Sequence, residues 1–344
     1  MRRRPTRWPA HLAPHLLYLI PELLIAAGPL VIGAITDSSG RRQFRMPDFF
    51  YGGQALIEGV MMRGRTTVAM SVRPPSGEIK TMSEPLPAAL SAERRLIKIP
   101  LLRGVFLLYE TLVIGTRMLM RSAAIAAEGE DVELGKGTIA LTMVFSLGFA
   151  IGLFFLLPLF LSTFAEDATS SDFAANAVEG LIRLGIFVAY IAAIGMMSDI
   201  RRVFAYHGAE HKAISAYEAD RPLTPDEVDA FGTAHTRCGT TFILIVVVIS
   251  IFFFSLVPRA GVPLPLLFLS RIVLVPVIAA FAYELVRFGA RHYGNRVVRA
   301  LYAPGLWLQS LTTRPPDRSM LEVSIASLES CLAADREAAA AATA

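Results

Sequence analysis

The chain has 344 residues, of which 54% are hydrophobic and 18% charged, and its formal net charge is +4. This balance is too apolar for an ordinary soluble protein and indicates a polytopic membrane protein. Two cysteines far apart make no disulfide framework, and the sequence contains no P-loop, no dinucleotide fingerprint and no basic–aromatic surface typical of nucleic-acid binding.

Residues 1–45 are a basic and apolar N-terminal extension that begins MRRRPTRWPAHL. If this segment spanned a membrane, Arg41, Arg42 and Arg45 would lie outside, against the positive-inside rule, and its prolines weaken a spanning helix. We therefore expect an extension that does not span, or else a protein that begins at Met46.

Residues 46–95 predict a small cytosolic α+β module. The run TTVAMSVRPPSGEIKTMSE is typical of a β-hairpin, with a Thr/Val-rich strand and a Pro-Pro-Ser-Gly turn. Before it stands YGGQALIEGVMMRGR, where Gly53, Gly59 and Gly64 indicate close backbone approach or positive φ. Glu58 in this run is either a solvated turn residue or a contact to a ligand or substrate.

Residues 96–128 predict a long amphipathic helix. Its charged residues Arg103, Glu110, Arg117 and Arg121 follow at intervals of seven, seven and four, which forms one polar stripe on an apolar helix. A helix of this kind lies in a membrane interface or packs on a helix bundle.

Four apolar runs each reach the ~20 residues that a membrane-spanning helix needs. They cover Gly137–Ala165, Ala177–Ser198, Thr240–Pro258 and Leu264–Phe288, and so place two spans in residues 137–198 and two in residues 240–288. We expect their charged residues, Arg183, Arg271 and Glu284, to face the bundle interior or an interface.

The loops between these spans set the orientation. Lys and Arg are concentrated in residues 199–239 and after the fourth span, in residues 289–344, whereas the loop after the first span is acidic. The positive-inside rule therefore places both segments in the cytoplasm. The last segment predicts a short amphipathic helix from about Asp317 and a low-complexity tail.

The stretch HGAEH in the first cytoplasmic segment has the pattern H-x-x-E-H, with His207, Glu210 and His211. On a helix, positions i and i+4 share a face, so two imidazoles can converge on one cation and Glu210 can reach a water beside it. Zinc acidifies such a water, and a carboxylate can take its proton. The alternative is a half-buried amphipathic stripe in which both histidines are structural.

A metal site needs a third ligand. His235 and Cys238 follow in the same cytoplasmic segment, with Arg237 between them as a further candidate for the site. Cys238 is alternatively a small buried hydrophobe. Glu284 is the other candidate ligand, since it returns to the cytoplasmic end of the fourth span, and its alternative partner is an arginine such as Arg287.

Four motifs occur in order along residues 47–332: GGQALIEGVMMRGR, HGAEHK, HTRCGTTF and PGLWLQSLTTRPP. Together they resemble the bacterial YqhQ family, a membrane family of unknown function often described as a predicted metal-dependent enzyme. The resemblance implies a multi-pass protein of the bacterial cytoplasmic membrane. The H-x-x-E-H order is also similar to the inverted zinc-protease motif, whose third ligand is a downstream Glu, and Glu284 lies 73 residues after His211.

The expected function is that of a metal-dependent, hydrolytic membrane enzyme. His207 and His211 would bind a divalent metal, with zinc favoured, Glu210 would be the base, and His235, Cys238 or Glu284 would complete the ligands. The alternative is a non-enzymatic membrane scaffold or assembly factor with structural polar motifs. Membrane lipid is the expected partner in both cases, and nucleic acid is not.

Overall fold

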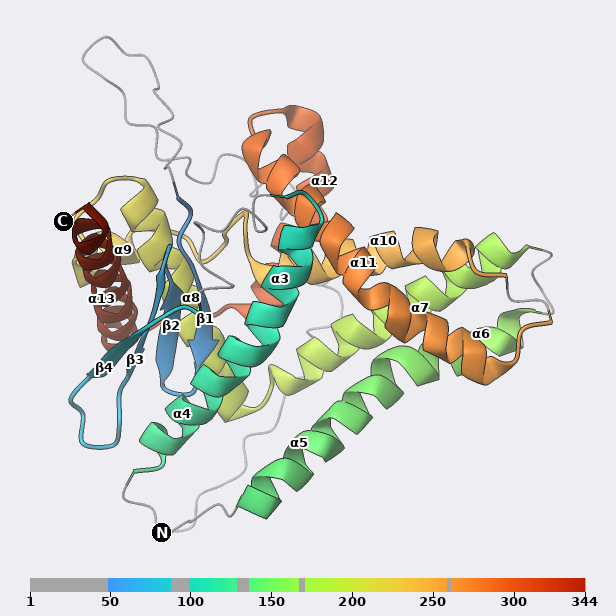
Figure 1. Ribbon diagram of the computed structural model, residues 1–344, viewed down its shortest axis with the longest axis horizontal. Helices are drawn as coiled ribbons and strands as arrows, with labels where there is room; N and C mark the ends of the chain where they lie inside the picture. The colour runs from blue at the N-terminus through green and yellow to red at the C-terminus, as the bar shows by residue number, and fades with distance from the viewer. Residues whose placement is uncertain (1–48, 88–98, 129–135, 167–170, 259–260, 344) are drawn as a thin grey trace, which may run out of the picture. The chain divides into compact units, whose positions relative to one another are not determined.

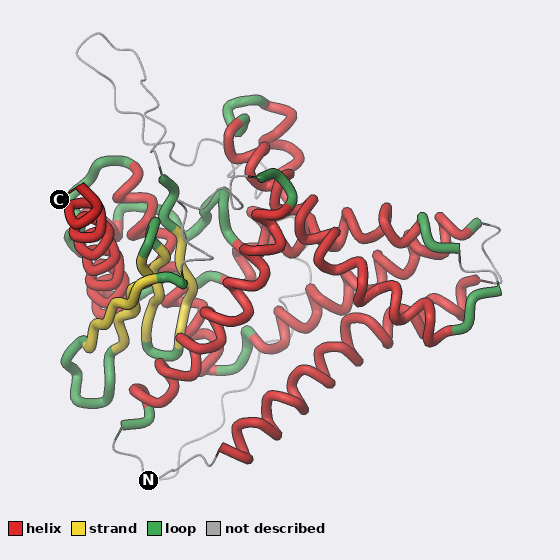
Figure 2. Tube along the Cα trace, viewed as in Figure 1, coloured by secondary structure: helices red, strands yellow, loops and turns green. Residues whose placement is uncertain are grey.

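A computed structural model of the chain describes residues 49–87, 99–128, 136–166, 171–258 and 261–343 (Figures 1 and 2). These residues form many helices and one small antiparallel sheet, so the predicted, mainly helical class is confirmed. The predicted N-terminal extension, residues 1–45, lies outside the described residues, and its relation to a membrane stays a prediction.

The sheet has four strands in chain order, each antiparallel to the next. The strands are β1 (Gly52–Leu56), β2 (Gly59–Arg63), β3 (Thr67–Val72) and β4 (Lys80–Pro85). β3 and β4 are the predicted hairpin, which is confirmed. The first hairpin, β1 and β2, is not predicted because its glycine-rich run carries little strand propensity. Its two-residue turn places Glu58 at a φ of 52°.

Helices cover both faces of the sheet. α8 (Ser198–Glu218) and α13 (Arg318–Thr343) pack on one face, and the π-helical turn η1 (Thr111–Gly115) with α4 (Thr116–Ala126) packs on the other (Figure 1). Successive side chains of a strand point to opposite faces. In β2, Val60 and Met62 enter the first core and Met61 enters the second, which explains its unbroken apolar run.

Asp335 binds α13 to the turn between β2 and β3 through hydrogen bonds. Its carboxylate accepts the backbone N–H groups of Arg65 (2.6 Å) and Thr66 (3.1 Å) and the hydroxyl groups of Thr66 and Thr67 (both 3.0 Å). Burial raises the pKa of Asp335, but these hydrogen bonds outweigh burial and leave the pKa below its ordinary value. The segment predicted as a short helix and a tail forms one helix of 26 residues, and its apolar side chains belong to the core on one face of the sheet.

Three helices are long and apolar enough to cross a membrane: Ala140–Phe164, Asp172–Ile194 (α7) and Leu264–Arg291 (α11). The first is built from α5 (Lys136–Ile151), the π-helical turn η2 (Gly152–Leu156) and α6 (Leu157–Glu166). Their length and composition indicate a membrane protein.

The third predicted span, Thr240–Pro258, is shorter than expected. It forms α10 (Gly239–Ser255), a helix of 17 residues that ends in a turn before Pro258. At about 1.5 Å per residue it is ~25 Å long, whereas the hydrocarbon core is ~30 Å thick. Three long helices and one shorter apolar helix thus replace the expected four spans.

The predicted amphipathic helix is interrupted by η1, which separates α3 (Leu102–Glu110) from α4. Its polar stripe pairs with charges that lie far away in the sequence. Glu110 binds Arg63 of β2 (2.7 Å), and Arg117 and Arg121 bind Glu84 of β4 (2.7 and 2.6 Å). Three of the four charged residues in the stripe therefore join this helix to the sheet, and the helix's position at a membrane interface stays a prediction.

The apolar helices enclose a second ionic cluster. Arg271 of α11 is fully buried and donates to Glu179 and Asn176 of α7, each at 2.8 Å. Arg183 of α7 also binds Glu179, and its Nε donates to the carbonyl of Phe154 in η2 (2.9 Å). The charged residues of these helices thus face one another inside the bundle, as the sequence predicts for Arg183 and Arg271.

Candidate metal centre

A polar pocket of about 100 Å³ lies where α8, the N-terminal end of β1 and the start of α10 meet. It is lined by Tyr51, Gly52, Gly53, His207, Glu210, His211, Ile214, His235, Arg237, Cys238 and Gly239. The sequence offers eight candidate site residues, and six of them line this pocket: His207, Glu210, His211, His235, Arg237 and Cys238. They come from two segments separated by α9 (Pro225–Asp229).

One helix carries both histidines of the motif and Glu210. The imidazole ring centroids of His207 and His211 are 4.4 Å apart, as expected of positions one turn apart. α8 comes very close to the segment after α12 (Arg296–Thr312) at Gly208, where any side chain would collide with the carbonyl of Arg314. The glycine thus lets the helix pack tightly against its neighbours at the pocket.

Each of these imidazoles is oriented by a backbone carbonyl. Nδ1 of His207 lies 2.9 Å from the carbonyl oxygen of Thr312, and Nδ1 of His211 lies 2.5 Å from that of Thr233. A carbonyl only accepts, so each Nδ1 must carry the proton, and each neutral imidazole has its lone pair on Nε2. Metal-binding histidines are commonly fixed by this kind of contact.

Cys238 faces the two imidazoles. Its Sγ is 3.4 Å from Nε2 of His207, and ligand atoms of His207, His211 and Cys238 all lie within 4.8 Å of one another. Cys238 is also the N-cap of α10, since its sulfur accepts the backbone N–H of Thr240 (3.4 Å). The partial positive charge at a helix N-terminus favours an anionic ligand atom at this position.

His235 lies in the pocket but outside this group of three. Its ring centroid is 5.6 Å from that of His211, and its Nε2 is 3.5 Å from a carboxylate oxygen of Glu218. Gln309 of α12 holds its backbone, accepting its N–H (2.9 Å) and donating to its carbonyl (2.8 Å). Burial lowers the pKa of His235, which favours the neutral imidazole. Among the described residues, the group of candidate ligand atoms that lie within 4.8 Å of one another contains Cys238 and not His235.

The carboxylate of Glu210 points to the same space. One of its oxygens lies 3.6 Å from Nε2 of His211 and 4.0 Å from Nε2 of His207. The backbone of Gly53 lies directly against it, because a Cβ at that position would be 2.9 Å from Cγ of Glu210. The glycine in β1 that the sequence marked for close approach therefore forms one wall of the site.

Arg237 closes another side of the pocket. It forms an ion pair with Glu218, and its guanidinium lies over the ring of Phe50, 4.2 Å from the centroid. Burial lowers the pKa of Arg237 to about 10, so the group is charged at neutral pH. Tyr51, Gly52, Glu218 and Gln309 complete the surroundings and are not predicted. Of the β1 residues that line the pocket, the sequence singled out Gly53 alone.

The two remaining candidates lie elsewhere. Glu284 pairs with Arg103, accepting its Nε at 2.6 Å, and also accepts the backbone N–H of Leu101 at 3.1 Å. The expectation that Glu284 reaches the histidines is therefore wrong. α11 packs against α3, and the carboxylate of Glu284 forms an ion pair with Arg103 of α3. Glu58 occupies the turn between β1 and β2 and binds Arg202 of α8 (2.5 Å).

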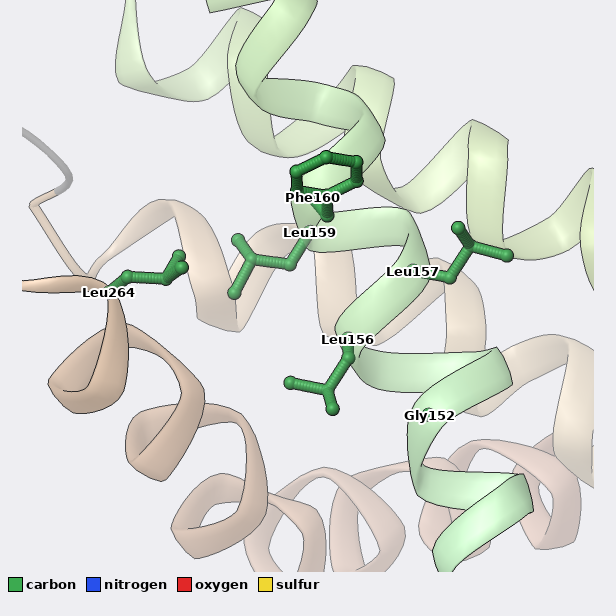
Figure 3. Close-up of a pocket in the computed structure, with 6 residues that line it drawn as sticks. All are labelled: Gly152, Leu156, Leu157, Leu159, Phe160 and Leu264. Carbon is green, nitrogen blue, oxygen red and sulfur yellow. The ribbon is translucent and has the colours of Figure 1, made fainter.

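A second hollow, of about 410 Å³, lies between α6, η2 and the start of α11 (Figure 3). It is lined by Gly152, Leu156, Leu157, Leu159, Phe160 and Leu264. None of these side chains can bind a metal or transfer a proton, so this hollow offers no chemistry. The smaller polar pocket is therefore the candidate site.

Donor chemistry fits the polar pocket to a metal of the zinc class. Two imidazole nitrogens and one thiol sulfur are the ligand types that zinc takes in proteins, and catalytic zinc sites have three protein ligands and one open position. The three ligand atoms come from α8 and the start of α10, both fixed by hydrogen bonds to neighbouring backbone. The arrangement is thus suited to hold one cation beside the carboxylate of Glu210.

Comparison with known proteins gives a family without an assigned activity. The model of the family described as "Protein of unknown function (DUF1385)" matches residues 99–334. The chain is 34% identical over 296 residues to the "Uncharacterized protein YqhQ" of Bacillus subtilis (strain 168), an alignment that covers 82% of this chain and 92% of the relative. No solved structure matches the chain.

Proposed function

The chain belongs to the DUF1385 family, and from this premise we propose that it is a metal-dependent hydrolase of the membrane whose site faces the cytoplasm. The convergence of His207, His211 and Cys238 carries the proposal. Both imidazoles present Nε2 to one space, because a carbonyl holds each Nδ1, and the sulfur of Cys238 lies 3.4 Å from one of them. Two histidines with only a structural role would not need to direct both Nε2 atoms to the same space.

Under this proposal the residues have distinct roles. His207, His211 and Cys238 hold the cation, and Glu210 takes a proton from a water in the pocket and passes it to the leaving group. Zinc, when bound, supplies a Lewis acid and lowers the pKa of water. His235 and Arg237 line the side of the pocket next to the ligands, where a polar substrate group would lie.

The cytoplasmic orientation follows from the distribution of charge. The connection between α7 and α10 contains most of the residues that line the pocket and is rich in Lys and Arg, as is the segment after α11. The segment between α6 and α7 contains Asp167 and no Lys or Arg. The positive-inside rule then places the pocket in the cytoplasm. Cysteine substitutions at Asp167 and Asp220 should be labelled from opposite sides, and labelling of both from outside would exclude this orientation.

Elemental analysis of the purified full chain tests the metal. We expect about one zinc per chain in the wild type, loss of most of it in His211→Ala, and retention in Glu210→Gln, which removes the base and keeps the shape. His292→Ala is the matched control, because His292 also holds a backbone carbonyl through Nδ1 (2.8 Å) but lies outside the pocket.

The scaffold alternative predicts another pattern. If the histidines only tie α8 to the carbonyls of Thr312 and Thr233, then His207→Ala and His211→Ala reduce stability alone and Glu210→Gln is nearly silent. A well-folded wild type that stays metal-free after zinc addition would end the hydrolase proposal and leave the scaffold.

A further inference from the structure

The edge strand of the sheet, β1, contributes to the lining of the polar pocket. β1 is the first strand in the order β1-β2-β3-β4, so one of its sides has no neighbouring strand within the described part of the chain. Gly52 and Gly53 of this strand line the pocket together with Glu210 and the two histidines of α8. Gly53 is also exposed to solvent.

The register shows which backbone groups face the open side. β1 and β2 are joined by the two residues Ile57 and Glu58, and Leu56 is paired with Gly59. The pair that closes a two-residue turn exchanges both hydrogen bonds, and such pairs alternate along an antiparallel ladder. Leu56, Gln54 and Gly52 therefore bond to β2. Gly53 and Ala55 point their N–H and C=O groups away from the sheet.

These outward groups are not used by other parts of the described structure. No hydrogen bond in residues 49–87, 99–128, 136–166, 171–258 or 261–343 joins them to another element. α8 packs against the side-chain face of β1, where Ala55 meets the core and Gly53 meets Glu210, and so it does not pair with the strand. Within the described residues, the edge thus has donors and acceptors that no other element uses, next to the candidate site.

We propose that β1 binds the substrate as an added strand and that the substrate is a polypeptide in extended conformation. This inference rests on the hydrolase proposed above. An extended main chain repeats its N–H and C=O groups every two residues, about 7 Å, which is the spacing of Gly53 and Ala55. An acyl chain has no groups that match this pattern, so a lipid would displace water from the edge without replacing its hydrogen bonds.

The docked strand would pass directly beside the base. Gly53 has no side chain on the face of β1 that meets α8, and a Cβ at this position would lie 2.9 Å from Cγ of Glu210. Hydrolysis there breaks one peptide C–N bond. The oxygen of water joins the carbonyl carbon, and Glu210 carries a proton from that water to the departing nitrogen, which leaves as an amine. No oxidant or further reactant is needed.

Binding of hydroxamate probes to the zinc-loaded full chain tests the substrate class without relying on activity. We would compare acetohydroxamate, an octanoyl hydroxamate and a hexapeptide hydroxamate. The hexapeptide should bind at least about tenfold more tightly than the other two, because each main-chain hydrogen bond adds about fivefold. It should also slow amide hydrogen exchange at Gly53 and Ala55, and a version N-methylated at the amides facing β1 should lose both effects.

A variant of the strand gives the matched control. Proline is tolerated on an edge strand where the N–H points outward, so Ala55→Pro removes one donor and blocks pairing while the sheet remains folded. Ala55→Gly keeps the donor. Both variants should retain zinc, and only Ala55→Pro should lose the advantage of the hexapeptide.

The outcomes separate the two proposals. If zinc binds but the hexapeptide binds no better than acetohydroxamate, or Gly53 and Ala55 exchange as before, the strand-docking inference is wrong and the metal centre stands. Tighter binding of the octanoyl probe, unaffected by Ala55→Pro, would overturn it in favour of a lipid substrate. If no zinc binds to the wild type, the hydrolase proposal fails first.

Discussion

The molecule has two buried polar clusters, one between the apolar helices and one at the pocket of α8 and α10, and their hydrogen bonding differs. In the cluster of Glu179, Arg183 and Arg271, each charged group points at another member, at Asn176 or at the carbonyl of Phe154. In the pocket of α8 and α10, His207 and His211 use only Nδ1 to hold the structure, and both Nε2 atoms face Cys238 and Glu210. A closed cluster supports the fold, whereas an open one can bind a ligand.

The largest effect should come from opening the closed cluster. Glu179→Leu leaves two buried guanidinium groups without this carboxylate, and breaking a buried ion pair in this way costs about 3–5 kcal/mol. We expect the unfolding free energy in detergent to fall by that amount while the folded fraction keeps its zinc. Leu181→Ala, at an exposed position of the same helix, is the control. Unchanged stability would show that the cluster does not support the fold.

The opposite behaviour is expected at Cys238. Serine is a good N-cap and can still accept the N–H of Thr240, so Cys238→Ser should keep α10 and the unfolding free energy near the wild type. A neutral hydroxyl is a poor zinc ligand, and zinc affinity should fall by at least about 100-fold, more than the loss of a supporting contact causes. Zinc titration measures this. Equal zinc affinity in both proteins would remove Cys238 from the ligand set.

A smaller effect on both the unfolding free energy and the zinc affinity is expected at Gln309, which binds the backbone of His235. Gln309→Leu leaves the backbone N–H and carbonyl of His235 without their partner, at a cost of about 1–3 kcal/mol. Unfolding and zinc titration should both shift modestly, because the loop that carries His235 and Cys238 loosens. Ser310→Ala, at the exposed neighbouring position, should change neither. If Gln309→Leu matches that control, the loop is held by other contacts.

The smallest effect is expected at Glu284. Its ion pair with Arg103 is partly exposed, and Gln at this position can still accept the N–H of Leu101, so Glu284→Gln should cost less than about 1 kcal/mol. Zinc content should not change. A clear loss of zinc in this variant would show that Glu284 is a ligand and would contradict its pairing with Arg103.

Local patterns in the sequence predicted what lies within one element. The spacing of His207, Glu210 and His211 placed them on one helix, and the turn signal at Pro74 and Gly77 identified the hairpin of β3 and β4. Both depend on residues a few positions apart, where periodicity and turn chemistry act directly.

Contacts across the chain were predicted less well. No local sequence pattern reveals that Gly53 lies against Glu210, or that Glu284 pairs with Arg103 and so lies away from the histidines. Those pairings depend on how the helices pack, and a charge at a helix end is equally compatible with a metal and with an arginine. His235 and Cys238 were assigned to the same site as the histidines, but their order as ligands is set by the hydrogen bonds of Gln309 and the cap of α10.

The fastening of α13 to the sheet also affects how the protein is made. Asp335 binds residues that precede it by about 270 positions, and α13 supplies Leu321, Leu328 and Cys331 to the core above β2 and β3. The strands of the sheet are synthesised first, and all of the apolar helices follow before α13 is synthesised and can cover the sheet. Until α13 has been synthesised, the apolar side chains of β2 and β3 that it buries stay exposed, although α8 packs on the same face, and this exposure favours aggregation of the nascent chain.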